Sequence, residues 1–195
     1  MPYPAKISAA SVRAAALERL EAGGLEALSM RALAADLGVT AASLYRYYPD
    51  RAALEAGIAE EGFRLLHAAL ASAVTSAEPR TAAYSAARAY LEFARRQPAL
   101  YTLLMAAHKP PVDAGADEEP QAENGLWGFV LALVGRVTGR ADDADAAVAR
   151  WAYLHGFVEL ERAGVIGARK PWTSFEAGLG ALLFGLVAAA RAPTP

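Results

Sequence analysis

Hydroxyl, phenol and guanidinium groups concentrate in the segment 40–51, which reads TAASLYRYYPDR. Tyr45, Arg46 and Tyr47 stand next to one another, and groups of these kinds donate hydrogen bonds to phosphate oxygens and to base edges. Two alanines in the same segment leave room for a helix to approach another surface closely. The segment therefore predicts non-covalent recognition of a nucleic acid.

The residues around this segment predict two short helices joined by a tight turn. Ser29 is a favourable N-cap for the first helix, whose apolar residues recur at helical spacing. Gly38 can adopt the positive φ that a tight turn requires. Thr40 is a second N-cap, which opens a short helix expected to run to position 47, and Asp50 caps a third helix. This order of caps and turn residues is typical of a helix-turn-helix.

In a helix-turn-helix the second helix lies in the major groove of DNA, with its N-terminal residues against the base edges. Its outward side chains are expected to be small or polar, whereas Leu44 and Tyr48 are expected to face the interior of the small domain. The predicted DNA-contacting residues are Arg31, Thr40, Ala41, Ala42, Ser43, Tyr45, Arg46, Tyr47 and Arg51.

Residues 8–56 resemble the N-terminal domain of the TetR family of transcriptional regulators. The shared pattern is a first helix ending in a glycine, a tight turn, a tyrosine-rich recognition helix and a basic residue just after it. By this resemblance Arg31 and residues 40–43 lie near the bases, while Tyr45, Tyr47 and Arg51 bind the phosphate backbone. Tyr47 stands where the family more often has histidine.

The same resemblance implies a function. The chain is expected to be a dimeric, ligand-responsive regulator, in the first place a repressor, that binds a double-stranded, pseudo-palindromic DNA operator. A small-molecule effector is expected to bind the C-terminal part and to release the DNA.

Composition indicates a globular, all-α chain of about nine helices. The chain has 195 residues, is 55% hydrophobic and carries a formal net charge of −2. Alanine is abundant, and no alternating strand pattern of useful length is present. A three-helix DNA-binding domain is expected in residues 1–50 and a helical ligand-binding and dimerisation domain in residues 51–195. The lack of cysteine suits a reducing compartment, and the N-terminus lacks the apolar core of a signal peptide, so the expected location is the cytoplasm.

The last two helices carry more apolar surface than one subunit is expected to need, which predicts a homodimer. Small residues recur at spacings of three and four on the final helix, a pattern along which a second helix packs closely. The alternative is a helix buried within one chain. The apolar stretch 178–190 is shorter than the ~20 residues of a membrane span, so no membrane anchor is expected. The predicted interface residues are Trp151, His155, Gly178, Ala181, Leu182, Gly185 and Ala188.

The stretch 151–164, WAYLHGFVELERAG, resembles the tryptophan-histidine-glycine subgroup of C-terminal domains in the same family. This resemblance implies an inducer-binding domain. Aromatic, Met and His residues at helical spacing suit an apolar or aromatic effector, although residues of these types also fill ordinary cores. The candidate pocket residues are Phe63, His67, Tyr90, Phe93, Tyr101, Met105, His108, Trp127, Trp151 and His155.

The sequence contains no HExxH, GxSxG or GxxxxGK[ST] motif. Asp142, Asp143 and Asp145 are expected to cap a helix rather than to bind a cation. No enzymatic activity, cofactor or metal is therefore expected. Besides the regulator, two alternatives remain: an α-helical small-molecule carrier, and a helical interaction protein without DNA-binding activity.

Overall fold

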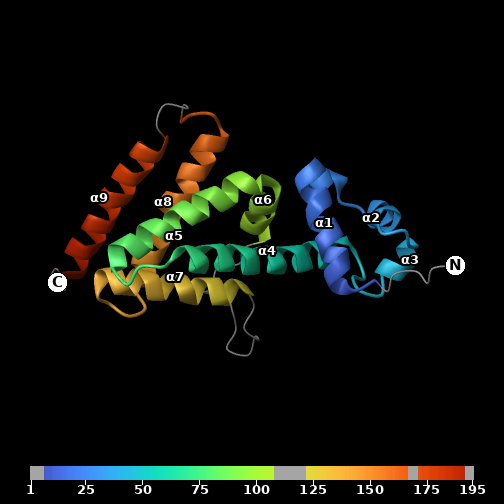
Figure 1. Ribbon diagram of the computed structural model, residues 1–195, viewed down its shortest axis with the longest axis horizontal. Helices are drawn as coiled ribbons and strands as arrows, with labels where there is room; N and C mark the ends of the chain where they lie inside the picture. The colour runs from blue at the N-terminus through green and yellow to red at the C-terminus, as the bar shows by residue number, and fades with distance from the viewer. Residues whose placement is uncertain (1–6, 108–121, 167–170, 192–195) are drawn as a thin grey trace. The chain divides into compact units, whose positions relative to one another are not determined.

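The computed structural model describes residues 7–107, 122–166 and 171–191, and every regular element within these ranges is helical (Figure 1). This confirms the all-α fold, with nine α-helices and one short 3-10 helix in the described residues. Their bounds are α1 Ala9–Gly23, η1 Leu25–Ala27, α2 Met30–Asp36, α3 Ala41–Leu44, α4 Arg51–Ala73, α5 Pro79–Arg96, α6 Pro98–Ala107, α7 Ala122–Thr138, α8 Ala144–Arg162 and α9 Pro171–Arg191.

The chain divides into two compact units. The first comprises Met1–Leu65 and Arg96–Glu123, and the second comprises Leu66–Arg95 and Asn124–Pro195. The first unit thus contains α1 to α3, the beginning of α4, and α6. The second contains the rest of α4, nearly all of α5 and α7, and the whole of α8 and α9.

The predicted helix-turn-helix is present in the first unit. The Ser29 hydroxyl accepts a hydrogen bond from the backbone N–H of Ala32 at 3.2 Å and so caps α2. Gly38 has φ 63°, and the N–H of Val39 then closes the turn by donating to the carbonyl of Ala34 at 2.9 Å. Asp50 caps α4 in the same way, because its Oδ1 accepts from the N–H of Ala53 at 2.7 Å.

The predicted second helix begins after Thr40 as expected but ends earlier than predicted. The α-helical part of α3 ends at Leu44 instead of continuing to Tyr47, because the N–H groups of Tyr47 and Tyr48 both donate to the Leu44 carbonyl and tighten the chain into a turn. Thr40 occupies the N-cap position, but its hydroxyl forms a hydrogen bond with the Ser43 hydroxyl at 2.9 Å rather than with a backbone N–H. The two hydroxyls therefore order each other.

Fully buried aliphatic side chains hold the first unit together. Leu20 of α1, Leu33 of α2, Leu44 of α3 and Leu54 of α4 are each completely removed from solvent, and burial of such a side chain contributes about 1.5–3 kcal/mol. Helix α6 packs against α1, where the Glu21 carboxylate accepts a hydrogen bond from the first-turn N–H of Leu100 at 2.8 Å.

In the second unit α8 packs along α9 (Figure 1). Tyr153 of α8 lies against Gly178, where an added Cβ would come within 2.5 Å of the Tyr153 hydroxyl, and that hydroxyl donates to the Phe175 carbonyl at 2.7 Å. Helices α7 and α8 share an apolar cluster that includes Val130, Val134, Ala146 and Ala147. Asp143 caps α8 by accepting from the N–H of Ala146, which agrees with the capping role expected for the acidic segment.

The apolar part of α9 is longer than the stretch 178–190 considered in the sequence, so its length does not exclude a membrane span. This part runs over Trp172–Arg191, 20 residues, which is long and apolar enough to cross a bilayer by length and composition alone. The core helix of a globular protein can pass the same test. Only 17% of that apolar window is buried within the chain, so α9 presents a large apolar surface.

Candidate nucleic-acid interface and C-terminal domain

In the segment that follows Gly38, some side chains are buried and anchor the segment, and others face outward. Leu44 and Tyr48 are buried, as expected, and Tyr45 and Tyr47 are 50% and 37% exposed. Thr40, Ala42 and Arg46 are also exposed, and Ala41 and Ser43 are half-buried. The two buried residues therefore fix the segment on the domain, and its small and polar side chains form the free surface.

Tyr48 is positioned from two sides. Its hydroxyl accepts a hydrogen bond from Nη1 of Arg13 at 3.1 Å, and this bond raises the pKa of the Arg13 guanidinium. Its ring lies over Gly57 of α4, where an added Cβ would meet the ring edge at 2.8 Å. Helices α1 and α4 thus hold the end of the segment after Gly38 in place.

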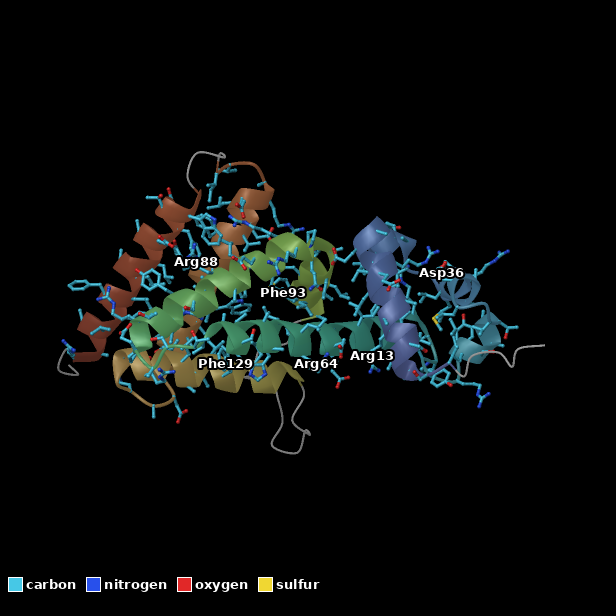
Figure 2. The ribbon with its side chains drawn as sticks, viewed as in Figure 1. Arg13, Asp36, Arg64, Arg88, Phe93 and Phe129 are labelled. Carbon is cyan, nitrogen blue, oxygen red and sulfur yellow. The ribbon has the colours of Figure 1, made fainter. Side chains whose placement is uncertain are left out.

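Arg19 and Asp36 join α1 to α2. Nε and Nη2 of Arg19 donate to the two carboxylate oxygens of Asp36 at 2.7 and 3.1 Å, and Nη1 donates to the carbonyl of Ala27 at 3.2 Å. A forked pair of this kind fixes orientation as well as distance. The Arg19 guanidinium also lowers the pKa of the Asp36 carboxyl, the residue labelled on α2 in Figure 2.

Two of the predicted phosphate ligands form hydrogen bonds within the chain. Arg51 donates from Nε to the Glu55 carboxylate at 2.6 Å and from Nη2 to the carbonyl of Leu25 at 3.0 Å. The Tyr47 hydroxyl donates to the carbonyl of Ile7 at 2.7 Å. By contrast, Arg31 and Arg46 are exposed, and neither forms a salt bridge with any described residue.

The candidate pocket residues fall into both compact units. In the first unit Phe63 and Tyr101 are buried and Met105 is half-buried; His108 lies outside the described residues. The remaining candidates belong to the second unit, where Tyr90 and Phe93 are buried (Phe93 is labelled in Figure 2). The half-buried members there are His67, Trp127, Trp151 and His155.

Several of the candidates in the second unit contact one another or the core. The Trp151 indole donates to the Tyr90 hydroxyl at 3.3 Å, and its ring lies 6.4 Å from that of His155. His67 lies 5.2 Å from Phe129, which is labelled in Figure 2. Trp127 packs against the apolar cluster of α7 and α8. The structure therefore links Tyr90, Trp151 and His155 in one row.

Arg150 was missed by the sequence analysis. Its side chain is 1% exposed on α8, Nη2 donates to the Ala83 carbonyl of α5 at 3.4 Å, and Nε is buried without a hydrogen-bond partner. Burial lowers its pKa to about 10, so the guanidinium stays protonated at neutral pH. A signal was available, because Arg150 stands at helical spacing from Ala146, Ala147 and Leu154 on the apolar face of the helix.

The predicted interface residues of α9 do not all lie on one surface. Ala181, Gly185 and Ala188 are exposed and Leu182 is half-buried, and Phe184 beside them is 74% exposed. Gly178, however, faces Tyr153 of its own chain, so its missing side chain serves the contact between α8 and α9. Sequence spacing alone did not separate these two roles.

Trp172 at the beginning of α9 lies between two arginines of α5. The guanidinium carbon of Arg88, labelled in Figure 2, lies 4.8 Å from the indole centroid, and that of Arg95 lies 4.7 Å from it. Arg95 is fixed in turn by two hydrogen bonds to the Glu161 carboxylate at 2.6 and 2.8 Å. These cation–π contacts hold the start of α9 against α5.

The helical fold and the exposed segment after Gly38 together define the class of helix-turn-helix DNA-binding regulators. The profile of the bacterial regulatory proteins of the tetR family matches residues 12–64, and the profile of the tetracyclin repressor-like C-terminal domain matches residues 83–182. The second match alone covers half of the chain. The protein therefore belongs to the TetR family of transcriptional regulators, which are DNA-binding proteins rather than enzymes.

Individual relatives agree with this assignment. An uncharacterised HTH-type transcriptional regulator of Mycobacterium tuberculosis is 29% identical over 168 residues, which cover 84% of this chain and 74% of the relative. A protein of unknown function from Rhodococcus sp. has a similar structure, with a TM-score of 0.81, 27% identity and coverage of 96% and 99% of the two chains. A TetR variant from Acinetobacter baumannii in complex with minocycline shares the fold at a TM-score of 0.71, 22% identity and coverage of 96% and 100%.

Proposed function

We propose that the protein is a homodimeric, ligand-responsive repressor that binds a pseudo-palindromic DNA operator. The exposed segment after Gly38, anchored by the buried Leu44 and Tyr48, is the observation that carries this proposal. A two-fold dimer presents two such segments to half-sites one helical turn apart, roughly 34–36 Å. Residues 1–50 are the proposed reader, and residues 51–195 are the proposed effector-binding and dimerisation domain of a cytoplasmic protein.

In the proposed complex Arg31, Thr40, Ala41, Ala42 and Ser43 lie at the base edges or the groove edge, and Tyr45, Arg46, Tyr47 and Arg51 bind phosphates. Exposed Arg46 needs no rearrangement to do so. Arg51 uses two of its five N–H donors on described residues, Glu55 and Leu25, so the others can reach a phosphate. Tyr47 has to share or exchange its bond to the Ile7 carbonyl, because a hydroxyl has one proton to donate.

The exposed apolar surface of α9 supports the homodimer. Phe184 projects into solvent between small residues that let a second helix approach. Pairing two copies of this surface removes it from water, which is the ordinary driving force of association. The proposed interface residues are Ala181, Leu182, Phe184, Gly185 and Ala188, with Trp151 and His155 of α8.

We further propose that the effector is a small molecule with an apolar or aromatic body. The row of Tyr90, Trp151 and His155 supports this proposal, as does the complex of a protein of the same fold with minocycline. The stretch 151–164 would then belong to the tryptophan-histidine-glycine subgroup. An effector that binds the released conformation better than the DNA-bound one shifts the population, and DNA weakens effector binding by the same factor.

The test is a binding selection of the purified protein on a random-sequence duplex library at two salt concentrations, with the stoichiometry of the complex measured by light scattering. Enrichment of a pseudo-palindrome bound by two copies of the chain is the expected result. Absence of enrichment at both salt concentrations would overturn the proposal and favour the carrier or the interaction protein. The enriched duplex then serves as the probe for an effector screen.

A further inference from the structure

The interior of the second compact unit contains a cation that the described chain does not neutralise. Arg150 is almost completely buried, and no carboxylate of the described residues lies within ion-pair distance of its guanidinium. Buried charges are ordinarily paired, because removing an ion from water without a partner opposes folding. A partner from outside the described residues, such as a molecule that the chain binds, would remove this cost.

The few hydrogen bonds of Arg150 indicate that its guanidinium binds a partner from outside the described chain. A guanidinium has five N–H donors in a planar fork, and among the described residues Arg150 donates to one acceptor, the Ala83 carbonyl, at the long distance of 3.4 Å. Nε is fully buried and unpaired. The edge formed by Nε and an Nη nitrogen is one that receives the two oxygens of a carboxylate. Among the described residues, this edge thus lacks an acceptor of matching geometry.

The surroundings of Arg150 indicate the rest of the ligand. Ala83 and Tyr90 lie seven residues apart on α5, which places them on one face of the helix, two turns from each other. Tyr90 accepts a hydrogen bond from Trp151, the residue next to Arg150 on α8. The neighbourhood therefore combines one cation with aromatic and apolar side chains, a composition that suits a ligand with an acidic head and an apolar body.

We infer that the effector is an apolar carboxylic acid and that Arg150 receives its carboxylate, between α5 and α8 of the second compact unit. This inference rests on the proposed function in one respect, namely that the C-terminal domain binds an effector, and it adds the charge of that effector. Tyr90 and Trp151 are positioning residues for the apolar body. A bound carboxylate neutralises the buried cation and so stabilises the domain, as any ligand that prefers the folded state does.

The experiment measures thermal unfolding and isothermal binding of the full chain, without DNA, in the presence of carboxylates and their matched neutral amides. The probes are phenylacetate, 4-phenylbutyrate, octanoate and decanoate, each paired with its amide. The variants are Arg150→Met, which keeps an unbranched apolar side chain but removes the charge, and Arg150→Lys, which keeps the charge but loses the fork. Arg162→Met, at an exposed position of the same helix, is the matched control.

The expected result is that at least one carboxylate raises the unfolding temperature of the wild type and of Arg162→Met, whereas its amide does not. Arg150→Met should lose at least tenfold in affinity for that carboxylate, and Arg150→Lys should bind with intermediate affinity. Without ligand, Arg150→Met should unfold at the same temperature as the wild type or higher, because an unpaired buried charge has been removed.

Three results would each overturn the inference: no carboxylate distinguished from its amide, equal affinity of Arg150→Met and the wild type, or a markedly lower unfolding temperature of ligand-free Arg150→Met. The last would assign Arg150 a purely structural role. Because DNA is absent from the assay, these results are independent of the operator selection. A chain that binds carboxylates but selects no operator would refute the proposed regulator and leave this site standing.

Discussion

Nη1 of Arg13 lies 3.1 Å from the hydroxyl of Tyr48, to which it donates a hydrogen bond across 35 residues of sequence. This contact joins α1 to Tyr48, the residue that ends the segment after Gly38. Since the Tyr48 ring also packs over Gly57, the segment is fixed both to α1 and to α4. The orientation of the candidate DNA surface therefore depends on a side chain that is itself buried.

Tyr48→Phe removes the hydroxyl and keeps the ring. We expect the free energy of unfolding to fall by about 1 kcal/mol, the usual net contribution of one hydrogen bond, as measured by urea denaturation. Tyr45→Phe is the control, because Tyr45 is half exposed and its substitution should leave stability unchanged. Equal effects of the two substitutions would show that the bond to Arg13 contributes nothing.

Substitutions at Gly38 test whether the backbone conformation of the turn is the reason that glycine is required there. An added Cβ would meet no atom within 4 Å, but φ is 63°. Gly38→Ala should therefore destabilise the chain by about 1–2 kcal/mol through the left-handed backbone conformation. Gly38→Asn should cost clearly less, because asparagine tolerates this region. If alanine and asparagine are equally tolerated in denaturation experiments, the turn does not hold this conformation in solution.

The Arg19–Asp36 pair predicts a pH dependence in the acid range. The pKa of Asp36 is lower in the folded chain than in the unfolded chain, chiefly because Arg19 donates hydrogen bonds to the carboxylate. The folded state therefore binds this proton less readily. The stabilisation is complete above the ordinary aspartate pKa of about 3.9 and is lost as the pH falls through the lower, folded value.

Asp36→Asn provides the measurement for this pair. The wild type should unfold at a higher temperature than the variant at pH 7, and the difference should shrink below pH 4 and vanish once the folded carboxyl is protonated. A difference that stays constant from pH 7 to pH 2 would mean that the charge of Asp36 does not act through Arg19. The exposure of the pair makes the effect small and sensitive to salt.

Local signals in the sequence predicted the helix caps and the turn of the first unit. Ser29, Gly38 and Asp50 act on backbone groups within a few residues, so their types predict the caps and the turn directly. Thr40 occupies the predicted N-cap position, but Ser43, three residues later, offers its hydroxyl a competing partner. The in-chain bond of Tyr47 could not be foreseen, since Ile7 stands 40 residues away in the sequence.

The C-terminal part shows a second limit of the sequence. Because arginine is ordinarily exposed, the pattern of apolar and aromatic residues at helical spacing did not predict that Arg150 is buried. Likewise, Gly178 and Gly185 share the spacing of small residues on α9, yet only Gly178 faces Tyr153. Which side of such a helix is covered depends on the packing of the neighbouring helix.

Phe184→Glu tests the proposed dimer. Placing a charge on the exposed apolar surface of α9 should convert the dimer into a monomer, as measured by light scattering after size exclusion, and leave helix content unchanged by circular dichroism. Ala71→Glu, at an exposed position of α4, introduces the same charge elsewhere and should remain dimeric. A dimeric Phe184→Glu variant would locate the interface away from this surface.

Whether the segment after Gly38 binds DNA can be measured by titrating the selected duplex with the wild type and with Arg46→Ala over a series of salt concentrations, using fluorescence anisotropy. The wild type should show a linear fall of log K with log salt concentration. Arg46→Ala should bind more weakly to all sequences and have a salt slope smaller by about one, because one phosphate contact is lost. Identical affinities and slopes for the two proteins, with the fold intact, would contradict the account.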